Sequence, residues 1–212
     1  MTLNIGFIGD SITLGSYLNP GENPAARCGA ILAAGLGETV NIVNLGANGS
    51  TSDQWRPSQA FYYSGTSAFA SAGVTDVLMM LGANDCKTGV DVSGATFQSN
   101  ISEIVNQLIT DGYLRVWLNY PSWCTWDVGS PTLHLVEYQI SIQNVANGTT
   151  IRVGDTTAYS FFEANQDLLL DGVHPLATGA NDLGGFWAAP LLAFFGARVV
   201  RKSWKGARLQ RR

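Results

Sequence analysis

The sequence predicts an α/β fold, a three-layer α/β/α sandwich around a central five-stranded parallel sheet. Two observations support this prediction. Five short apolar runs recur along the 212 residues, and stretches with helical periodicity lie between several of them. Strands that alternate with helices favour a parallel sheet covered on both faces. The 24 glycines suit a fold with many tight turns between strands and helices.

The five predicted strands are short, partly β-branched and bounded by Gly, Asn or Pro, which is typical of buried parallel strands. They occupy residues 3–8, 40–45, 77–81, 114–118 and 150–153. We therefore expect the strands to form the centre of the molecule and the helices to form its outer layers.

The clearest predicted helix lies between the third and fourth strands. Its apolar side chains share one face at spacings of three and four: Phe97, Ile101, Ile104, Val105 and Leu108. Gly112 follows them as a stop signal. Two further helices are predicted around residues 134–144 and from about 177 to 195, the second despite its glycines and Pro190.

The charge is unevenly distributed along the chain. Seven of the twelve Lys and Arg residues lie in residues 198–212, which contain no acid. Residues 1–197 hold five basic against sixteen acidic side chains, a net charge of −11. An acidic body of this kind argues against a protein that binds nucleic acid.

This division predicts a single domain over residues 1–197 and a basic C-terminal tail over residues 198–212. A plain reading of the tail is a solvated extension. An alternative reading is a basic helix, since Val199, Val200, Trp204 and Leu209 recur at roughly helical spacing. Such a helix would dock on the acidic body, on a neighbouring subunit or on an anionic membrane surface.

Two further features concern the cellular setting. The first predicted strand follows Met1 directly, with no secretory leader, and no run of eighteen apolar residues predicts a membrane span. We therefore expect an intracellular protein without integral membrane association. Cys28, Cys86 and Cys124 are too few for a disulfide scaffold and lack the spacing of a zinc site.

Four short motifs contain the residues that could perform chemistry. Residues 9–11 read Gly-Asp-Ser directly after the first predicted strand, and residues 44–51 read Asn-Leu-Gly-Ala-Asn-Gly-Ser-Thr after the second. Residues 82–85 read Gly-Ala-Asn-Asp after the third, and residues 171–175 read Asp-Gly-Val-His-Pro. Because active sites in such sheets form at the carboxyl ends of the strands, these motifs are expected to meet at one edge.

The residue types in these motifs match the needs of nucleophilic catalysis. A serine hydroxyl is a weak nucleophile unless a base takes its proton, and the base needs a partner that holds its tautomer. Ser11, His174 and Asp171 supply these three groups. Asp10, next to the serine, is expected to order the loop through hydrogen bonds.

Together the four motifs, in this order, resemble the SGNH (GDSL) hydrolase superfamily, and the resemblance covers residues 3 to about 190. It implies a flavodoxin-like strand order of 2-1-3-4-5. It also implies that Ser11 is the nucleophile, His174 the general base and Asp171 its partner. The implied oxyanion hole consists of the Ser11 N–H, the Gly46 N–H and the Asn84 side-chain amide. No cofactor or metal is implied.

Aromatic side chains follow the predicted strands near the same edge. Trp123 and Trp126 follow the fourth strand and are candidates for substrate binding, although they could equally pack the long loops. In the implied strand order the third and fourth strands are neighbours. Cys86 and Cys124 would then both lie beyond the carboxyl ends of these two strands, close enough for a disulfide to be considered.

The resemblance implies a serine esterase acting on a small-molecule ester, with short acyl chains such as acetyl as the first expectation. A carbohydrate O-acetylesterase and a lysophospholipase or thioesterase remain alternatives. From another class, a non-catalytic sugar-binding module on a hydrolase scaffold is the rival, although the complete set of motif residues argues against it. The sequence lacks the Gly-x-Ser-x-Gly elbow of ordinary α/β-hydrolases. It leaves the oligomeric state open.

Overall fold

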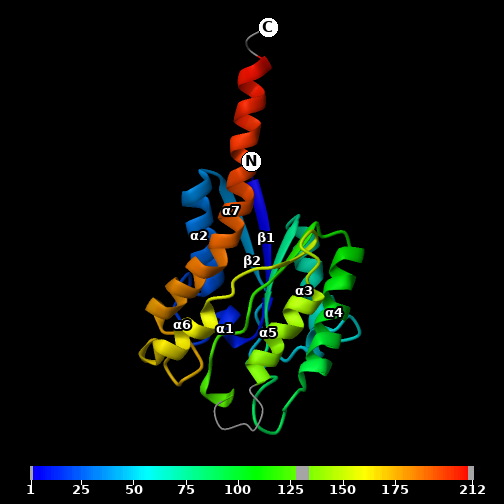
Figure 1. Cartoon of the computed structure of the whole chain (residues 1–212), viewed down its shortest axis with the longest axis vertical. Coiled ribbons are helices and arrows are strands. Elements are labelled where there is room, and N and C mark those ends of the chain that lie inside the picture. Colours follow the sequence, from blue (N-terminus) through cyan, green and yellow to red (C-terminus); the bar gives the residue numbers. More distant parts are fainter. Residues whose placement is uncertain (1, 128–133, 210–212) are drawn as a thin grey trace.

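The computed structural model describes residues 2–127 and 134–209, with side chains up to residue 197 (Figure 1). All five predicted strands form, and their ends differ from the predicted ones by at most one residue. They are β1 (Thr2–Gly9), β2 (Thr39–Asn44), β3 (Asp76–Met80), β4 (Arg115–Leu118) and β5 (Ile151–Val153). Every neighbouring pair is parallel, and the order is β2-β1-β3-β4-β5. The predicted fold class and strand order are therefore confirmed.

Helices cover both faces of this sheet. They are α1 (Ser11–Leu14), α2 (Pro24–Leu36), α3 (Ala60–Ser71), α4 (Gly94–Thr110), α5 (His134–Val145), α6 (Ala158–Ala164) and α7 (Ala177–Leu209). Short 3₁₀ turns lie at η1 (Asp53–Trp55), η2 (Thr125–Asp127) and η3 (Gln166–Leu168). α2 packs against α7, and α4 against α5. Figure 1 shows α2 and α7 on one side of the sheet and α3, α4 and α5 on the other.

The helix predicted between the third and fourth strands is confirmed as α4. Its five predicted apolar side chains are all buried, because they share the face that meets the sheet. Ser93 caps its first turn by accepting the N–H of Thr96, and Gly112, with φ of 98°, lies just beyond its end. Left-handed backbone of this kind favours glycine.

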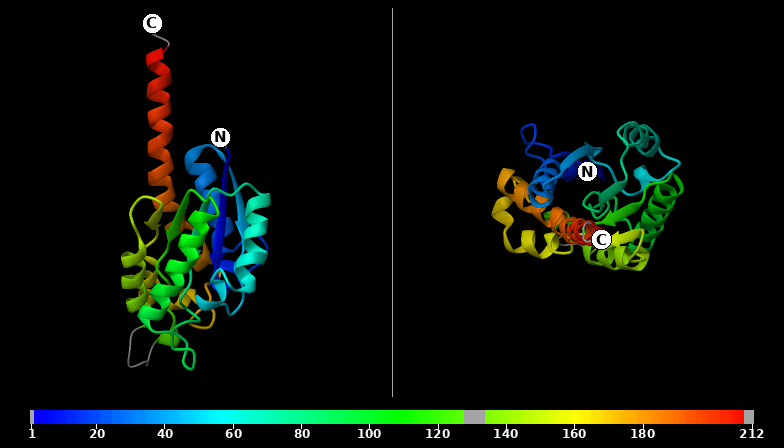
Figure 2. Two further views of the ribbon diagram at one scale, coloured as in Figure 1. Left: turned by 90° about the vertical axis from the view of Figure 1, so that its right-hand side faces the viewer. Right: turned by 90° about the horizontal axis from the view of Figure 1, so that it is seen from above.

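α7 is longer than predicted, since it continues from residue 195 to Leu209 and includes Pro190. Figures 1 and 2 show its C-terminal part extending away from the sheet, at the end of the molecule where β1 begins. The expected boundary between residues 197 and 198 therefore lies within a continuous helix. The proposed docking of the tail depends on side chains that lie outside the described ones.

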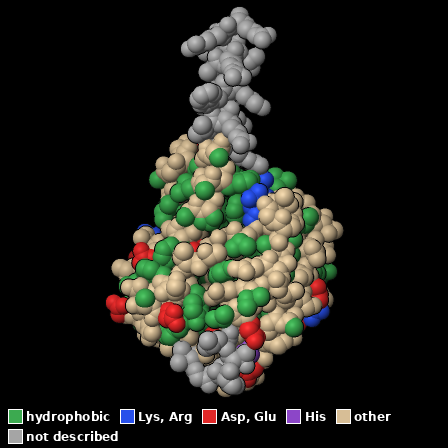
Figure 3. Space-filling model, in the orientation of Figure 1, with side chains coloured by type: hydrophobic (Ala, Val, Ile, Leu, Met, Phe, Trp, Pro, Cys, Tyr) green, Lys and Arg blue, Asp and Glu red, His purple; other side chains and the backbone are tan. Residues whose placement is uncertain are grey.

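The core lies on the central strands. All five residues of β3 are buried, and so are Ile5, Phe7 and Ile8 of β1. Within the described part of the chain, no helix has both the length and the apolar character of a membrane span. On the face shown in Figure 3, Lys and Arg side chains are few, and acidic ones gather towards the lower end, where the carboxyl ends of the strands lie.

Candidate active site

Ser11 stands at the junction of β1 and α1. β1 ends at Gly9, where an added Cβ would lie 2.7 Å from the carbonyl oxygen of Met80 on the neighbouring strand, so only glycine fits. Asp10 caps α1, its Oδ1 accepting the N–H of Ile12 at 2.9 Å. Ser11 is then the first helical residue, and its own N–H has no acceptor within the helix. The turn therefore places a hydroxyl and a free N–H at the carboxyl edge of the sheet.

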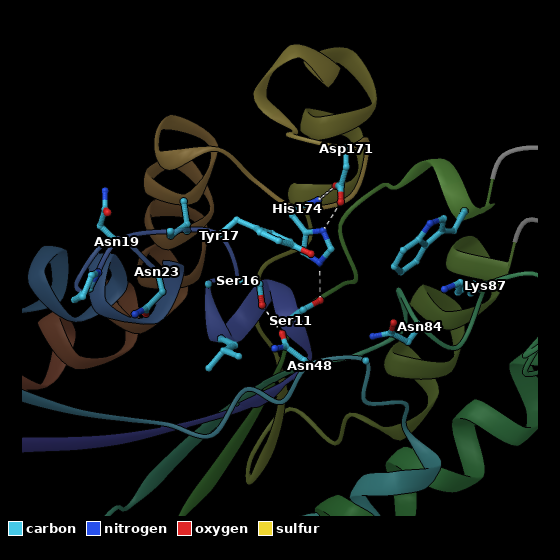
Figure 4. A pocket seen from close by; sticks show the side chains of 16 residues that line it. Ser11, Ser16, Tyr17, Asn19, Asn23, Asn48, Asn84, Lys87, Asp171 and His174 are labelled. Atoms are coloured by element: carbon cyan, nitrogen blue, oxygen red, sulfur yellow. Dashed lines mark hydrogen bonds and ion pairs between the residues drawn. The ribbon is translucent and has the colours of Figure 1, made fainter.

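His174 and Asp171 lie beside this serine (Figure 4). Ser11 Oγ is 2.8 Å from His174 Nε2, and His174 Nδ1 is 2.8 Å from Asp171 Oδ2. The other carboxylate oxygen, Oδ1, accepts the backbone N–H groups of His174 at 2.9 Å and Val173 at 3.1 Å. A three-residue spacing thus lets one carboxylate hold both the ring and the backbone of the histidine.

The electrostatics favour an ionised Asp171. Burial alone would raise the pKa of this carboxyl, but the hydrogen bonds from the backbone and ring of His174 and from Val173 outweigh it, and the pKa is lowered. A carboxylate held this way fixes the tautomer in which Nδ1 carries the hydrogen, so that Nε2 faces Ser11 as an acceptor. The arrangement can take a proton from the serine hydroxyl.

The expected position of Gly46 needs correction, because it does not line the cavity around Ser11. Its N–H already donates to Asn44 Oδ1 at 2.9 Å, and it packs so closely on α1 that an added Cβ would lie 2.2 Å from Leu14 N. Gly49, three residues later, lines the cavity instead, with φ of 71°. Its N–H donates to no hydrogen bond among the described residues.

Asn84 lies where the sequence predicted, in the wall of the same cavity. Its Nδ2 donates one hydrogen to the carbonyl of Ser50 at 3.0 Å, and a primary amide has a second hydrogen to offer. This bond connects the loop after β3 to the loop that contains Gly49. The two loops are thereby held in register at the site.

A buried polar network lies behind Asn84. Both oxygens of Asp85 accept from the Ser52 N–H, at 3.0 and 3.1 Å, and Oδ1 also accepts from the Ser52 hydroxyl at 2.5 Å. Asn100 of α4 donates to the same hydroxyl at 2.9 Å. Burial raises the pKa of Asp85 to about 6, although the Ser52 hydrogen bonds lower it in part. The network ties α4 to the two loops.

The cavity has a volume of about 810 Å³. Two aromatic rings stand edge-on to His174: Tyr17, with ring centroids 5.1 Å apart, and Trp126, at 6.4 Å. Trp126 therefore lies where the sequence predicted. Trp123 does not line the cavity, because its side chain is buried in the core.

One wall of the cavity was not predicted from the sequence. The segment between α1 and α2 supplies Tyr17, Asn19 and Asn23, and Asn48, in the loop after β2, accepts a hydrogen bond from the Ser16 hydroxyl of that segment (Figure 4). No periodicity marks these residues. The only local signal is the density of Gly, Asn and Pro in residues 15–23, which is typical of a loop.

Cys86 and Cys124 do come together. Both thiols are buried, and their sulfurs lie 3.9 Å apart without a bond between them. The hydrogen bond between the two thiols and their burial raise the pKa of Cys86. The two cysteines lie in the loops that contain Asn84 and Trp126, and both are buried.

A model of the GDSL-like lipase/acylhydrolase family matches residues 7–181, which include Ser11, Asn84, Asp171 and His174. The chain belongs to this family. It is a carboxylic ester hydrolase, as the resemblance of the four motifs implied. No curated protein matches the chain.

Solved structures with the fold of this GDSL-like hydrolase have low sequence identity to it. A lipase/acylhydrolase from Enterococcus faecalis is 22% identical, with a TM-score of 0.68, over 90% of this chain and 96% of that one. The psychrotrophic esterase EstA from a Pseudoalteromonas species is 14% identical, with a TM-score of 0.71, over 91% and 98%. A two-domain esterase active on acetylated mannans is 18% identical, with a TM-score of 0.63, over 87% and 47%.

Proposed function

We propose that this GDSL-like hydrolase is a serine esterase that cleaves esters of short acyl groups, such as acetyl, through a covalent acyl-enzyme. The observation that carries the proposal is the hydrogen-bonded series from Ser11 Oγ through His174 to Asp171, with both bonds at 2.8 Å. These are the geometry and residue types of a Ser-His-Asp triad.

In the first half-reaction, Ser11 Oγ attacks the ester carbonyl carbon while His174 Nε2 takes the hydroxyl proton. Asp171 stabilises the imidazolium that forms. The carbonyl oxygen becomes an oxyanion, for which we propose three donors: the N–H groups of Ser11 and Gly49 and the second hydrogen of Asn84 Nδ2. Gly49 takes the role first expected of Gly46, because its N–H is free and it lines the cavity.

The tetrahedral intermediate then collapses. The bond between the carbonyl carbon and the alcohol oxygen breaks, and His174 gives its proton to that oxygen. In the second half-reaction a water attacks the acyl-enzyme, with His174 again as base, and the acid and free Ser11 are released. No step requires a group beyond the named side chains and water.

The preference for a short acyl chain rests on the polarity of the cavity. Four asparagine side chains line it: Asn19, Asn23, Asn48 and Asn84. A long alkyl chain would desolvate these amides without replacing their hydrogen bonds, which is unfavourable. The same amides, with Tyr17 and Trp126, favour a sugar O-acetyl ester as a second candidate substrate.

The test uses Ser11→Ala with 4-nitrophenyl esters from acetate to dodecanoate. Ser11→Ala should abolish turnover and keep the melting temperature. Ser64→Ala, which removes a hydroxyl that bonds only within α3, is the matched control and should keep wild-type activity. A fluorophosphonate should add its mass to a peptide containing Ser11. Turnover by Ser11→Ala, or labelling elsewhere, would refute the mechanism.

The acyl preference is tested in the same series, together with acetylated xylo- and manno-oligosaccharides. We expect kcat/KM to fall as the chain lengthens beyond four carbons. A maximum at eight carbons or more would favour the lysophospholipase or thioesterase alternative. Binding of the oligosaccharides without hydrolysis of any ester would favour the non-catalytic sugar-binding module.

A further inference from the structure

The basic side chains of residues 1–197 are few, and nearly all have a partner. Three arginines lie within 4.0 Å of a carboxylate: Arg27, Arg56 and Arg115. Arg152 donates to the carbonyl of Thr149 at 2.9 Å. Lys87 is the fifth and the only lysine before residue 202. Among the described residues, no carboxylate lies within ion-pair distance of it.

This lysine lies at the catalytic cavity, on the same side as Asn84 (Figure 4). Its Nζ is 4.8 Å from the centre of the Trp126 ring, a distance at which a cation and an aromatic face attract. Trp126 in turn stands edge-on to His174. The positive charge is therefore placed beside the reacting groups of a body that is otherwise strongly acidic.

The backbone holds Lys87 in place. Its carbonyl accepts the N–H of Val90 at 2.8 Å and that of Asp91 at 3.1 Å. The carboxylate of Asp91, the nearest acid that follows in the chain, turns into its own loop and accepts the N–H of Gly89 at 2.9 Å. The carboxylate of Asp91 is therefore bound to the backbone of its own loop and does not pair with the Lys87 ammonium.

The position of His174 indicates which half of an ester meets this cation. His174 Nε2 must deliver a proton to the leaving alcohol oxygen, so the alcohol half passes beside the imidazole. Trp126 and Lys87 extend the cavity from that ring. The opposite wall, formed by residues 15–23, has asparagines and apolar side chains but no cation.

We propose that Lys87 and Trp126 form a subsite for an anionic group on the alcohol half of the substrate. The preferred esters then have a carboxylate, phosphate or sulfate on the alcohol. This inference rests on the proposed esterase function and specifies its substrate class. Trp126 supplies a flat apolar surface for the body of the alcohol, and Lys87 supplies the charge at its far end.

The test compares 4-acetoxybenzoate with its methyl ester, which differ in one charge on the leaving phenol. Lys87→Met should raise KM for 4-acetoxybenzoate about fivefold, the effect of a partly exposed ion pair, and leave kcat unchanged. KM for the methyl ester should not change. Lys87→Arg should recover most of the lost affinity, and 0.5 M NaCl should reduce the wild-type preference.

Two controls complete the test. Arg56→Met removes a positive charge outside the cavity and should not change KM for 4-acetoxybenzoate or for its methyl ester. Mono-4-nitrophenyl succinate has its anion on the acyl half, so Lys87→Met should not change KM for this ester. Three results would overturn the inference. Lys87→Met could change KM equally for both acetoxybenzoates, it could change KM for neither, or it could change KM for the succinate alone. If the wild type hydrolyses none of these esters, the proposed function itself is wrong and the inference falls with it.

Discussion

Asp10 offers a quantitative test of how the turn that holds Ser11, the proposed nucleophile, is stabilised. It is buried beneath Ser11, and only its Oδ1 accepts a hydrogen bond, while Oδ2 has no partner among the described residues. Burial raises the pKa of Asp10 from 3.8 to about 7; the Ile12 N–H lowers it in part, and the nearby charge of Asp85 raises it further. We expect the folded protein to keep this carboxyl protonated under mildly acidic conditions.

The sign of the effect follows from proton linkage. Because the folded state binds this proton more tightly than the unfolded chain does, the stabilisation is complete below pH 3.8 and is lost as pH rises to about 7. A pKa raised this far corresponds to about 4 kcal/mol in the free energy of unfolding. Asp10→Asn keeps a neutral acceptor for Ile12 at every pH and should lack this dependence.

Urea unfolding of both proteins at half-unit steps from pH 4 to pH 8 measures the effect. As pH rises across this range, the free energy of unfolding of Asp10→Asn should increase by up to about 4 kcal/mol relative to that of the wild type. Asp167→Asn removes an exposed carboxylate and serves as the control. If the curves of free energy against pH for Asp10→Asn and wild type run parallel, Asp10 is ionised in the folded protein and the reasoning is wrong.

Three further predictions concern the site. Asn84→Ala should lower kcat for 4-nitrophenyl acetate by 10²–10³, about 2.7–4 kcal/mol, with little change in KM; a fall of less than tenfold would remove Asn84 from the oxyanion hole. Gly46→Ala should lower the melting temperature and the activity together, because its Cβ would clash with the backbone of α1. In Gly49→Ala the added Cβ has open space, so chemical unfolding should show only the cost of the positive φ, a loss of about 1 kcal/mol in the free energy of unfolding. The unreduced protein, unfolded in guanidinium, should titrate as three thiols with Ellman's reagent; a value near one would show that Cys86 and Cys124 have paired.

Much of the fold was predictable because its signals are local. β3 is buried along its whole length, so an uninterrupted apolar run was sufficient to identify it. Asp171 and His174 are hydrogen-bonded to each other across three residues, and their spacing, together with the family resemblance, indicated the pairing. Where a contact is made within one short segment, the sequence contains the information needed to predict it.

Other predictions differ from the structure where a contact between distant segments decides the outcome. Gly46 packs against the backbone of α1, where an added Cβ would lie 2.2 Å from Leu14 N, and nothing in the spacing of Gly46 and Gly49 reveals this contact. Trp123 and Trp126 are both aromatic and both follow β4. Trp126, within the turn η2, lines the cavity, whereas Trp123 is buried in the core.

The two parts of the proposed triad differ in how firmly the structure holds them. Ser11 follows β1, which pairs with β2 on one side and β3 on the other, so exchange of its strand amides requires opening of the sheet. Asp171 and His174 lie on a loop closed by one isolated bridge, between Leu169 and Pro175, and a few backbone hydrogen bonds. Such a loop opens at a lower free energy than the sheet, and its amides should exchange with deuterium first. Activity should accordingly disappear at a lower urea concentration than the secondary structure, because His174 would move away from Ser11 while β1 still holds Ser11 in place.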